Sequence, residues 1–209
     1  MKTLILTFIM LLPFSSIFGQ KDKVAKEVLD KVVNLLHKEG DIQASFSTSV
    51  YQNNSIQSET MGVLWLKNES FVLETKEMKT WYNGKYQWSL IFDMEEVNIS
   101  EPTEEELMEI NPYQLLKLYK KGYIYALGDK TSKSQEVILK SQDKNKNFQI
   151  IRIWIDTNSY EPTSLEVLSK DKSLTKIKIT EFKKKLNLSN SFFKFHQTEY
   201  PDVEIIDLR

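Results

Sequence analysis

The chain has 209 residues, of which 41% are hydrophobic and 11% aromatic, enough for one domain with a sizeable core. Its 28 basic and 29 acidic residues give a net charge of −1, so we expect no basic field and no nucleic-acid partner. There is no cysteine, which excludes disulfides, thiol catalysis, cysteine-based metal sites and a lipidated N-terminal cysteine.

The first residues are typical of a secretory signal peptide. The apolar run Leu4–Leu12 follows a short positive start, and the segment closes on the small residue Gly19. We therefore predict a signal at residues 1–19, cleaved before Gln20, and one domain over residues 20–209. An uncleaved membrane anchor is the alternative, but the apolar run is shorter than the ~20 residues that a spanning helix needs. The mature protein is predicted to be soluble beyond the inner membrane.

Apolar residues at helical spacing predict one amphipathic helix from Ala25 to Leu36. Alternating apolar and polar residues between polar turns then predict strands. These strands are Ala44–Tyr51, Gln57–Lys67, Ser70–Thr75, a hairpin over Met78–Phe92, Glu95–Ser100, Tyr123–Leu127, Gln135–Ser141, Phe148–Asp156, Thr163–Leu168 and Leu174–Lys183. The tail adds the apolar segments Phe192–Phe195 and Val203–Leu208.

The segment Trp81–Trp88 carries the strongest turn signal in the chain. Asn83-Gly84 suits the two central residues of a type I′ hairpin turn, because both need positive φ. That turn would place Trp81 opposite Tyr86 and would put the large rings of the hairpin on one face. Such a face needs a large apolar partner surface, which could be a filled core or the wall of a ligand cavity.

Two short helices are predicted to interrupt the strands. Thr103 and Glu106 form a capping box, so a helix should run to about Glu109. Asn111 and Pro112 are the N-cap and first residue of a second helix. The predicted fold is therefore mainly β with helices: an unclosed, curled antiparallel β-barrel of about eleven strands, covered by about three α-helices.

An enzyme is the competing class of function, and the sequence offers little for it. His37 is explained as a cation at the end of the first helix, and His196 lies in a polar tail segment. Neither has the spacing of a metal site or a catalytic triad, and no phosphate-binding loop occurs. We predict no catalytic residues, no metal and no cofactor.

Several ordered motifs carry a resemblance to a known family. They are Gln43-Ala44-Ser45-Phe46 after the first helix, Gly62-Val63-Leu64-Trp65-Leu66-Lys67, Asn83-Gly84-Lys85-Tyr86-Gln87-Trp88, Asn111-Pro112-Tyr113-Gln114-Leu115-Leu116, and the ending Phe193-Lys194-Phe195 with Tyr200-Pro201-Asp202-Val203. With the signal peptide, the mature chain resembles the periplasmic outer-membrane lipoprotein carrier family (LolA-like). Asp202 stands where that family usually has glycine.

The resemblance implies a periplasmic, non-enzymatic carrier with helices inside the mouth of its barrel and a hydrophobic cavity for the acyl chains of lipoproteins. It implies an inner-membrane ABC transporter as donor and an outer-membrane acceptor, and we expect the carrier to be a monomer. One departure concerns the lid: Asn68-Glu69 follow Lys67, where the family often has Arg-Pro to hold the helices closed. A periplasmic sensor that uses the same fold to bind another lipid or a protein partner is the alternative.

The side chains predicted to line such a cavity come from strands and from the helical lid. They are Phe46, Leu64, Leu66, Phe71, Trp81, Tyr86, Trp88 and Leu90 from strands, and Leu115, Leu116 and Tyr119 from the lid. Each of them taken alone could equally belong to an ordinary core.

Overall fold

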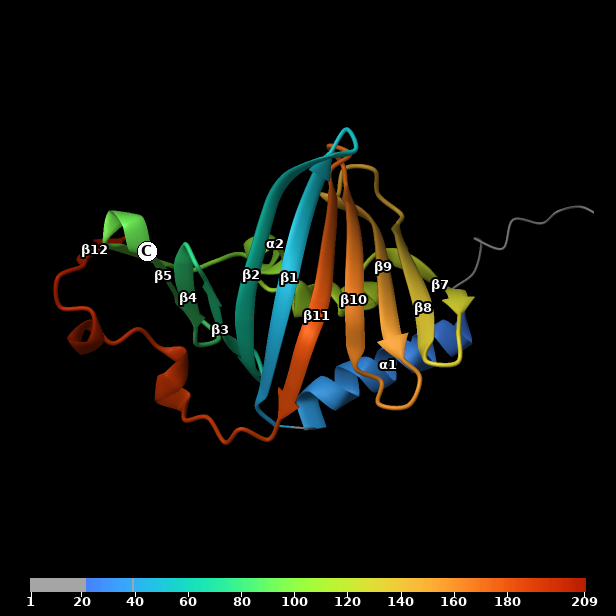
Figure 1. The fold of residues 1–209 in the computed structure, drawn as a ribbon, viewed down its shortest axis with the longest axis horizontal. Helices are drawn as coiled ribbons and strands as arrows, with labels where there is room; N and C mark the ends of the chain where they lie inside the picture. The colour runs from blue at the N-terminus through green and yellow to red at the C-terminus, as the bar shows by residue number, and fades with distance from the viewer. Residues whose placement is uncertain (1–21, 39) are drawn as a thin grey trace, which may run out of the picture.

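The computed structural model describes residues 22–38 and 40–209, so the predicted signal at residues 1–19 lies outside the described residues. A single curled sheet dominates the fold, and helices lie against its concave face (Figure 1). The helices are α1 (Lys23–Lys38), α2 (Glu104–Ile110) and α3 (Pro112–Leu115), and short 3₁₀ segments include η2 (Phe92–Met94), η3 (Leu118–Lys120), η4 (Asn190–Phe193) and η5 (Gln197–Glu199). No helix in this part of the chain is long and apolar enough to cross a membrane.

The sheet contains twelve strands in the order β12-β6-β5-β4-β3-β2-β1-β11-β10-β9-β8-β7. Their bounds are β1 (Ile42–Gln52), β2 (Ser55–Lys67), β3 (Ser70–Thr75), β4 (Met78–Tyr82), β5 (Gln87–Ile91), β6 (Glu96–Ser100), β7 (Tyr123–Lys130), β8 (Ser134–Ser141), β9 (Phe148–Asp156), β10 (Pro162–Ser169), β11 (Leu174–Lys184) and β12 (Glu204–Asp207). β7 and β12 are the two edges, so the barrel is unclosed as predicted.

The strand order explains why helices lie inside the curl. β1 to β6 run outward on one side of β1, and β7 to β11 return from the far edge until β11 pairs with β1. The chain between β6 and β7 must therefore cross the whole sheet. That crossing segment holds α2, α3 and η3, which we call the helical insert (residues 101–122).

Apolar side chains occupy different faces of the sheet in its two halves. The main core lies between the concave face and the helices, with Leu29 of α1, Leu64 of β2 and Ile153 of β9 fully buried. A second cluster lies on the opposite face of β2 to β6, around Val72 and Trp81. Alternation along each strand makes this possible, since neighbouring residues such as Phe71 and Val72 of β3 point to opposite faces.

The C-terminal segment covers the second cluster. Residues 186–209 run back over β2 to β6, and Phe193 is only 1% exposed there (Figure 1). Phe195 and Tyr200 stack on one another and both meet the edge of the Trp81 ring, with centroids 5.6 and 5.7 Å away. The segment ends in β12, which pairs with β6 in parallel, so it adds a twelfth strand and the one parallel pair described in the sheet.

The hairpin turn differs from the prediction. Trp81 pairs with Trp88 rather than with Tyr86, so the loop has four residues, and Asn83 is not among the residues with positive φ. The reason is that Asn83 Oδ1 accepts hydrogen bonds from the backbone N–H groups of Lys85 and Tyr86, at 3.0 and 2.9 Å, and so builds its own turn. The register shift of two residues keeps the rings on the predicted common face.

The helix signals of the insert are confirmed. Thr103 and Glu106 form the predicted capping box at α2, and the Asn111 side chain caps α3, which has Pro112 in its first turn. α3 is shorter than its apolar pattern suggests, because the chain continues as the 3₁₀ segment η3. The insert ends at Gly122, whose φ is +74°.

Candidate functional site

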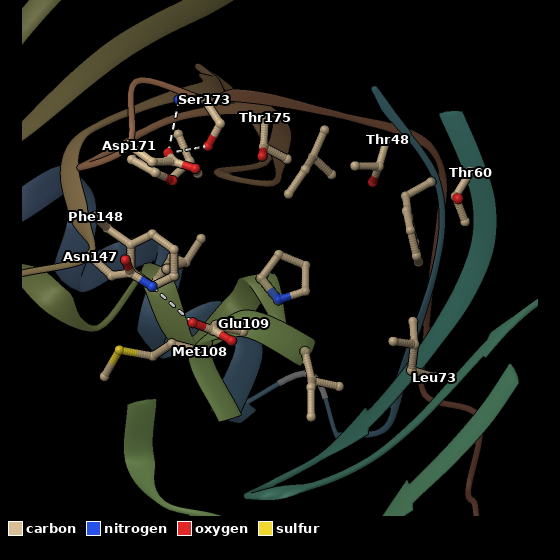
Figure 2. Close-up of a pocket in the computed structure, with 17 residues that line it drawn as sticks. Thr48, Thr60, Leu73, Met108, Glu109, Asn147, Phe148, Asp171, Ser173 and Thr175 are labelled. Atoms are coloured by element: carbon tan, nitrogen blue, oxygen red, sulfur yellow. Dashed lines mark hydrogen bonds between the residues drawn. The ribbon is translucent and has the colours of Figure 1, made fainter. Parts of the chain in front are cut away.

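An open cavity of about 440 Å³ lies at the end of the sheet that carries the β1–β2 and β10–β11 turns (Figure 2). We call it cavity I. Its buried apolar wall consists of Leu73, Leu115, Val167 and Ile177, and the half-buried ring of Phe46 adds to it. Its volume falls in the range typical of sites for small molecules, and such sites are usually mostly apolar.

The outer part of cavity I is polar. Strands and turns contribute hydroxyl groups there, from Thr48, Thr60, Ser169, Ser173 and Thr175. Asp171 also lines this part, and its carboxylate accepts hydrogen bonds from the backbone and side chain of Ser173 at 2.9 and 2.7 Å (Figure 2). Cavity I therefore offers an apolar interior to a chain and a hydrogen-bonding mouth to a polar end.

A second open cavity, of about 410 Å³, lies beside the first and is called cavity II. The two share four lining residues, which we call the partition: Met108, Glu109, Asn147 and Phe148. Asn147 Nδ2 donates to Glu109 Oε1 at 2.9 Å across this partition, from the β8–β9 turn to α2 (Figure 2). The remaining lining of cavity II comes mainly from charged side chains and is described below.

Tyr123 forms part of the wall of cavity II and is held firmly. Its hydroxyl donates to the Phe148 carbonyl at 2.7 Å. Burial raises the pKa of Tyr123 to about 12, so it stays protonated and keeps that hydrogen bond at neutral pH.

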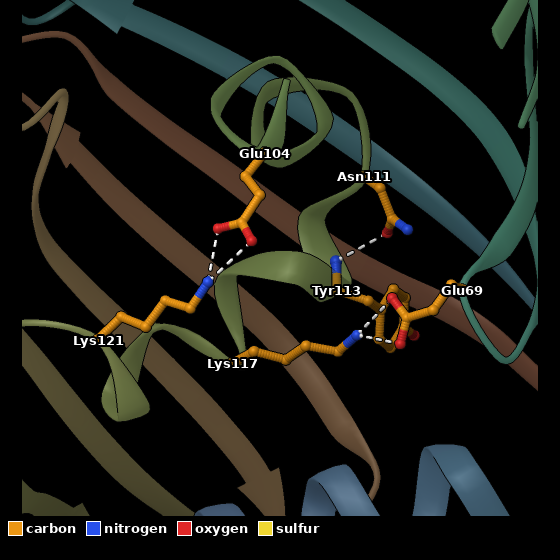
Figure 3. Close-up of polar contacts among 6 residues, drawn as sticks. All are labelled: Glu69, Glu104, Asn111, Tyr113, Lys117 and Lys121. Atoms are coloured by element: carbon orange, nitrogen blue, oxygen red, sulfur yellow. Dashed lines mark hydrogen bonds and ion pairs between the residues drawn. The ribbon is translucent and has the colours of Figure 1, made fainter. Parts of the chain in front are cut away.

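An ion pair joins the helical insert to the sheet, and another lies within the insert (Figure 3). Lys117 meets both carboxylate oxygens of Glu69 at 3.0 Å, which joins the insert to the β2–β3 turn. Lys121 holds Glu104 at the start of α2, with a shortest distance of 2.6 Å, and this contact lowers the pKa of Glu104. The insert therefore meets the β2–β3 turn through the carboxylate of Glu69.

The residues predicted to line one cavity are divided between three places. Phe46 and Leu115 line cavity I. The main core contains Leu64, Leu66, Phe71, Leu116 and Tyr119. The second cluster, under the C-terminal segment, contains Trp81 and Leu90 with Trp88 packed against it, and Tyr86 meets the edge of the Trp88 ring with centroids 6.4 Å apart. These hairpin side chains lie on the face opposite the helices. The two faces can be told apart on β3, where Leu73 packs in the main core and its neighbour Val72 packs in the second cluster with the hairpin.

The sequence reasoning did not select several lining residues. Val167 and Ile177 belong to strands that were predicted correctly, and strand alternation places them on the same face as Leu165. Their alternation with polar residues is visible in the sequence. It does not mark them as cavity residues, because only the pairing of β1 with β11 brings their strands beside Phe46. Met108 and Phe148, the two apolar members of the partition, carry no sequence signal of their own.

Comparisons with known proteins agree with this architecture. The family model described as "Outer membrane lipoprotein carrier protein LolA" matches residues 15–170. An uncharacterized conserved protein from Thermus thermophilus has a similar structure, with 16% identity and a TM-score of 0.61, over 88% of this chain and 99% of that one. No curated protein matches the sequence significantly.

Two further similar structures have lower scores. A LolA superfamily protein from Nitrosomonas europaea has 12% identity and a TM-score of 0.45, over 82% of this chain and 97% of that one. A putative outer membrane lipoprotein-sorting protein domain from Vibrio parahaemolyticus has 11% identity and a TM-score of 0.45, over 81% and 97%.

Proposed function

Because this chain belongs to the family of outer membrane lipoprotein carrier proteins LolA, we propose that it carries the acyl chains of lipoproteins through the periplasm. In this proposal a signal peptide directs the chain to the periplasm, an inner-membrane ABC transporter loads it and an outer-membrane acceptor unloads it. The protein acts as a carrier rather than an enzyme, and its task is to keep an apolar chain out of water until release.

Cavity I is the observation that carries the proposal. An acyl chain in water is costly, at about 0.8 kcal/mol for each methylene that leaves an apolar environment. The buried wall of Leu73, Leu115, Val167 and Ile177 offers such an environment without polar groups that would require a specific partner. The volume of about 440 Å³ lies within the range of about 300–1,000 Å³ that is typical of small-molecule sites.

The way the site is closed suits a carrier, which must also release its cargo. α2 covers the cavity but has no buried residue. It is tied to the barrel through the Glu109–Asn147 hydrogen bond. Elements with few buried contacts open at low free-energy cost, so α2 is the element that we expect to move when cargo enters or leaves.

A pair of tryptophan substitutions on β1 tests the proposal. Thr48 points into cavity I, and its neighbour Ser47 points to the opposite face of the same strand. Thr48→Trp should weaken the binding of a fluorescent long-chain fatty acid at least about tenfold, since the indole ring fills the cavity. Ser47→Trp is the matched control and should bind as the wild type does, because its indole ring lies on the face of β1 that points away from cavity I.

Competition and pull-down complete the test. A synthetic lipidated peptide should displace the fluorescent fatty acid from the wild type. Acylated lipoproteins should co-purify with the protein from envelope extracts. If the fatty acid does not bind, or if Thr48→Trp binds it normally, the carrier proposal is wrong. A regulatory protein as the only co-purified partner would favour the sensor.

A further inference from the structure

Cavity II differs from cavity I in the chemistry of its lining. Three lysines and two carboxylates outside the partition line it, together with an amide: Lys121, Lys146, Lys170, Glu104, Glu105 and Asn145. Cavity I, by contrast, has no lysine in its lining. Donors and acceptors are thus mixed along cavity II, which shares the partition with an apolar cavity.

Some of these groups are already engaged, and others are free. Lys121 is paired with Glu104. Lys146 donates to the Lys121 carbonyl at 3.0 Å, with its ammonium 4.9 Å from the centre of the Tyr123 ring. The side chains of Lys170 and Glu105 make no hydrogen bond or ion pair with the rest of residues 22–38 and 40–209. The ammonium of Lys170 and the carboxylate of Glu105 are therefore available to a ligand.

We propose that cavity II is a peptide subsite, which holds the main chain of the peptide attached to an acyl group bound in cavity I. The proposal rests on the proposed function, since the acyl chain anchors the peptide. A peptide main chain carries an N–H donor and a C=O acceptor in each residue, which fits a mixed lining. A phosphate head group offers only acceptors and negative charge, so it could pair with the lysines but would leave the free carboxylate of Glu105 without a donor and close to a like charge.

The partition is where the acyl chain would join the peptide. Met108 and Phe148 are apolar and line both cavities, and the hydrogen-bonded pair Glu109–Asn147 supplies the polar part of the partition. An amphiphile that crosses the partition would thus meet an apolar surface on one side and charged groups on the other. Once the acyl chain is bound, contacts to the peptide are intramolecular, so even weak ones add measurably to affinity.

Three ligands with the same acyl chain test the subsite. They are lauramide, an N-lauroyl tetrapeptide amide without charged side chains, and lauroyl lysophosphatidylglycerol. Displacement of a fluorescent fatty acid from the full mature protein gives the affinity of each. The lauroyl peptide should bind about tenfold more tightly than lauramide, which is the gain expected from one or two hydrogen bonds to charged groups.

Lysine variants locate the gain. Lys170→Ala should reduce the ratio of the peptide affinity to the lauramide affinity several-fold, because it removes a free charged donor of cavity II. Lys144→Ala is the matched control: Lys144 is an exposed lysine of the β8–β9 turn that lines neither cavity, so the ratio should not change.

The outcomes separate this proposal from the proposed function. If no ligand binds, the carrier function itself fails. If lauramide and the lauroyl peptide bind equally well, the acyl site stands and the peptide subsite is wrong. The subsite is also wrong if Lys170→Ala and Lys144→Ala change the ratio equally. Preference for the lysophospholipid over the peptide would assign cavity II to a lipid head group and overturn the peptide assignment.

Discussion

At the scale of single residues, Gly62 decides how Phe46 sits in the wall of cavity I. The two residues are paired across β1 and β2. A Cβ atom on Gly62 would lie 2.7 Å from Phe46 Cζ and 2.7 Å from the backbone oxygen of Glu74. Both distances are too short for real contacts, so the ring occupies the space that a side chain at position 62 would need.

Gly62→Ala should therefore destabilise the protein by about 1–3 kcal/mol, the usual cost of overpacking. The midpoint of urea unfolding measures it. Replacing Phe46 by leucine in the Gly62→Ala background should recover only part of the loss, since the contact with the Glu74 oxygen is to backbone and remains. An unchanged midpoint for Gly62→Ala would show that the strands separate here without cost.

At the scale of elements, a short chain of polar contacts fixes α1 to the helical insert. The Tyr119 hydroxyl donates to Asp30 Oδ1 at 2.6 Å, and Lys26 pairs with Asp30 Oδ2 at 2.6 Å. Hydrogen bonds from Lys26 and Tyr119 lower the pKa of Asp30 below its ordinary value. The contact therefore joins η3 of the helical insert to α1.

This contact should make stability depend on pH on the acid side. Because the pKa of Asp30 is lower in the folded state, its contribution is fully present above the unfolded pKa of about 4 and is lost as pH falls through the folded value. Asp30→Asn keeps the hydrogen-bond acceptor but cannot ionise. Its urea midpoint should be below that of the wild type at pH 7, and the difference should shrink as the pH falls below about 4.

The contribution of Asp30 should be small, since the carboxylate is about a third exposed and solvent screens it. Asp93→Asn, at an exposed position without an ion pair in the described part of the chain, controls for removing one negative charge. If both variants change the pH dependence equally, the specific contact between α1 and the insert contributes nothing.

The Glu69–Lys117 ion pair should hold the insert locally rather than stabilise the whole fold. Exposed ion pairs are worth about 0–1 kcal/mol, and Glu69 is 59% exposed. Lys117→Met should raise amide hydrogen exchange in α3 and η3 about two- to fivefold, while exchange in β9 and β10 stays unchanged. The charge-swapped double variant Glu69→Lys/Lys117→Glu should restore protection, and failure to do so would assign the effect to packing.

At the scale of the whole molecule, the C-terminal segment completes the fold. Without it, the second cluster would leave Trp65, Trp81 and Trp88 in water on the outside of β2 to β5. The Asp41 carboxylate accepts from the Leu188 backbone N–H and lies 3.6 Å from Lys67 Nζ, which in turn donates to the Leu188 carbonyl. These partly buried polar contacts position the start of the segment over the sheet.

Phe193→Ala should destabilise the protein by about 3–5 kcal/mol, since Phe193 is 1% exposed and its loss leaves a cavity. Phe192 is its neighbour and is only half-buried, so Phe192→Ala is the matched control and should cost much less. Intrinsic tryptophan fluorescence during urea unfolding reports the change directly. Equal effects from both variants would show that the segment packs loosely.

Most of the fold could be predicted from local sequence, because strand alternation, helix spacing and capping act within a few residues. The strand Ser70–Thr75 and the Thr103 capping box are examples that the structure confirms. The hairpin register could not be predicted, since Asn83 had two ways of building a turn and only the pairing of Trp81 with Trp88 distinguishes them.

The candidate site was much harder to predict than the fold. Residues that meet in cavity I, such as Phe46 and Val167, are far apart in sequence, and the local pattern of each does not show that the two lie together. Trp81 and Leu90 have the same apolar pattern as Leu64, yet they lie on the other face because the C-terminal segment supplies their partner. Local alternation gives two faces for each strand and does not say which one meets the helices.

The sequence by itself determined the elements of this protein, its mainly β class and the resemblance to lipoprotein carriers, because these depend on residue types at short and regular spacing. Only the tertiary structure decided which apolar surfaces are filled and which stay open. The return of β11 to β1 brings the wall of cavity I together, and the path of residues 186–209 closes the second cluster. Both are contacts between distant parts of the chain, and packing selects them only when all the elements are in place.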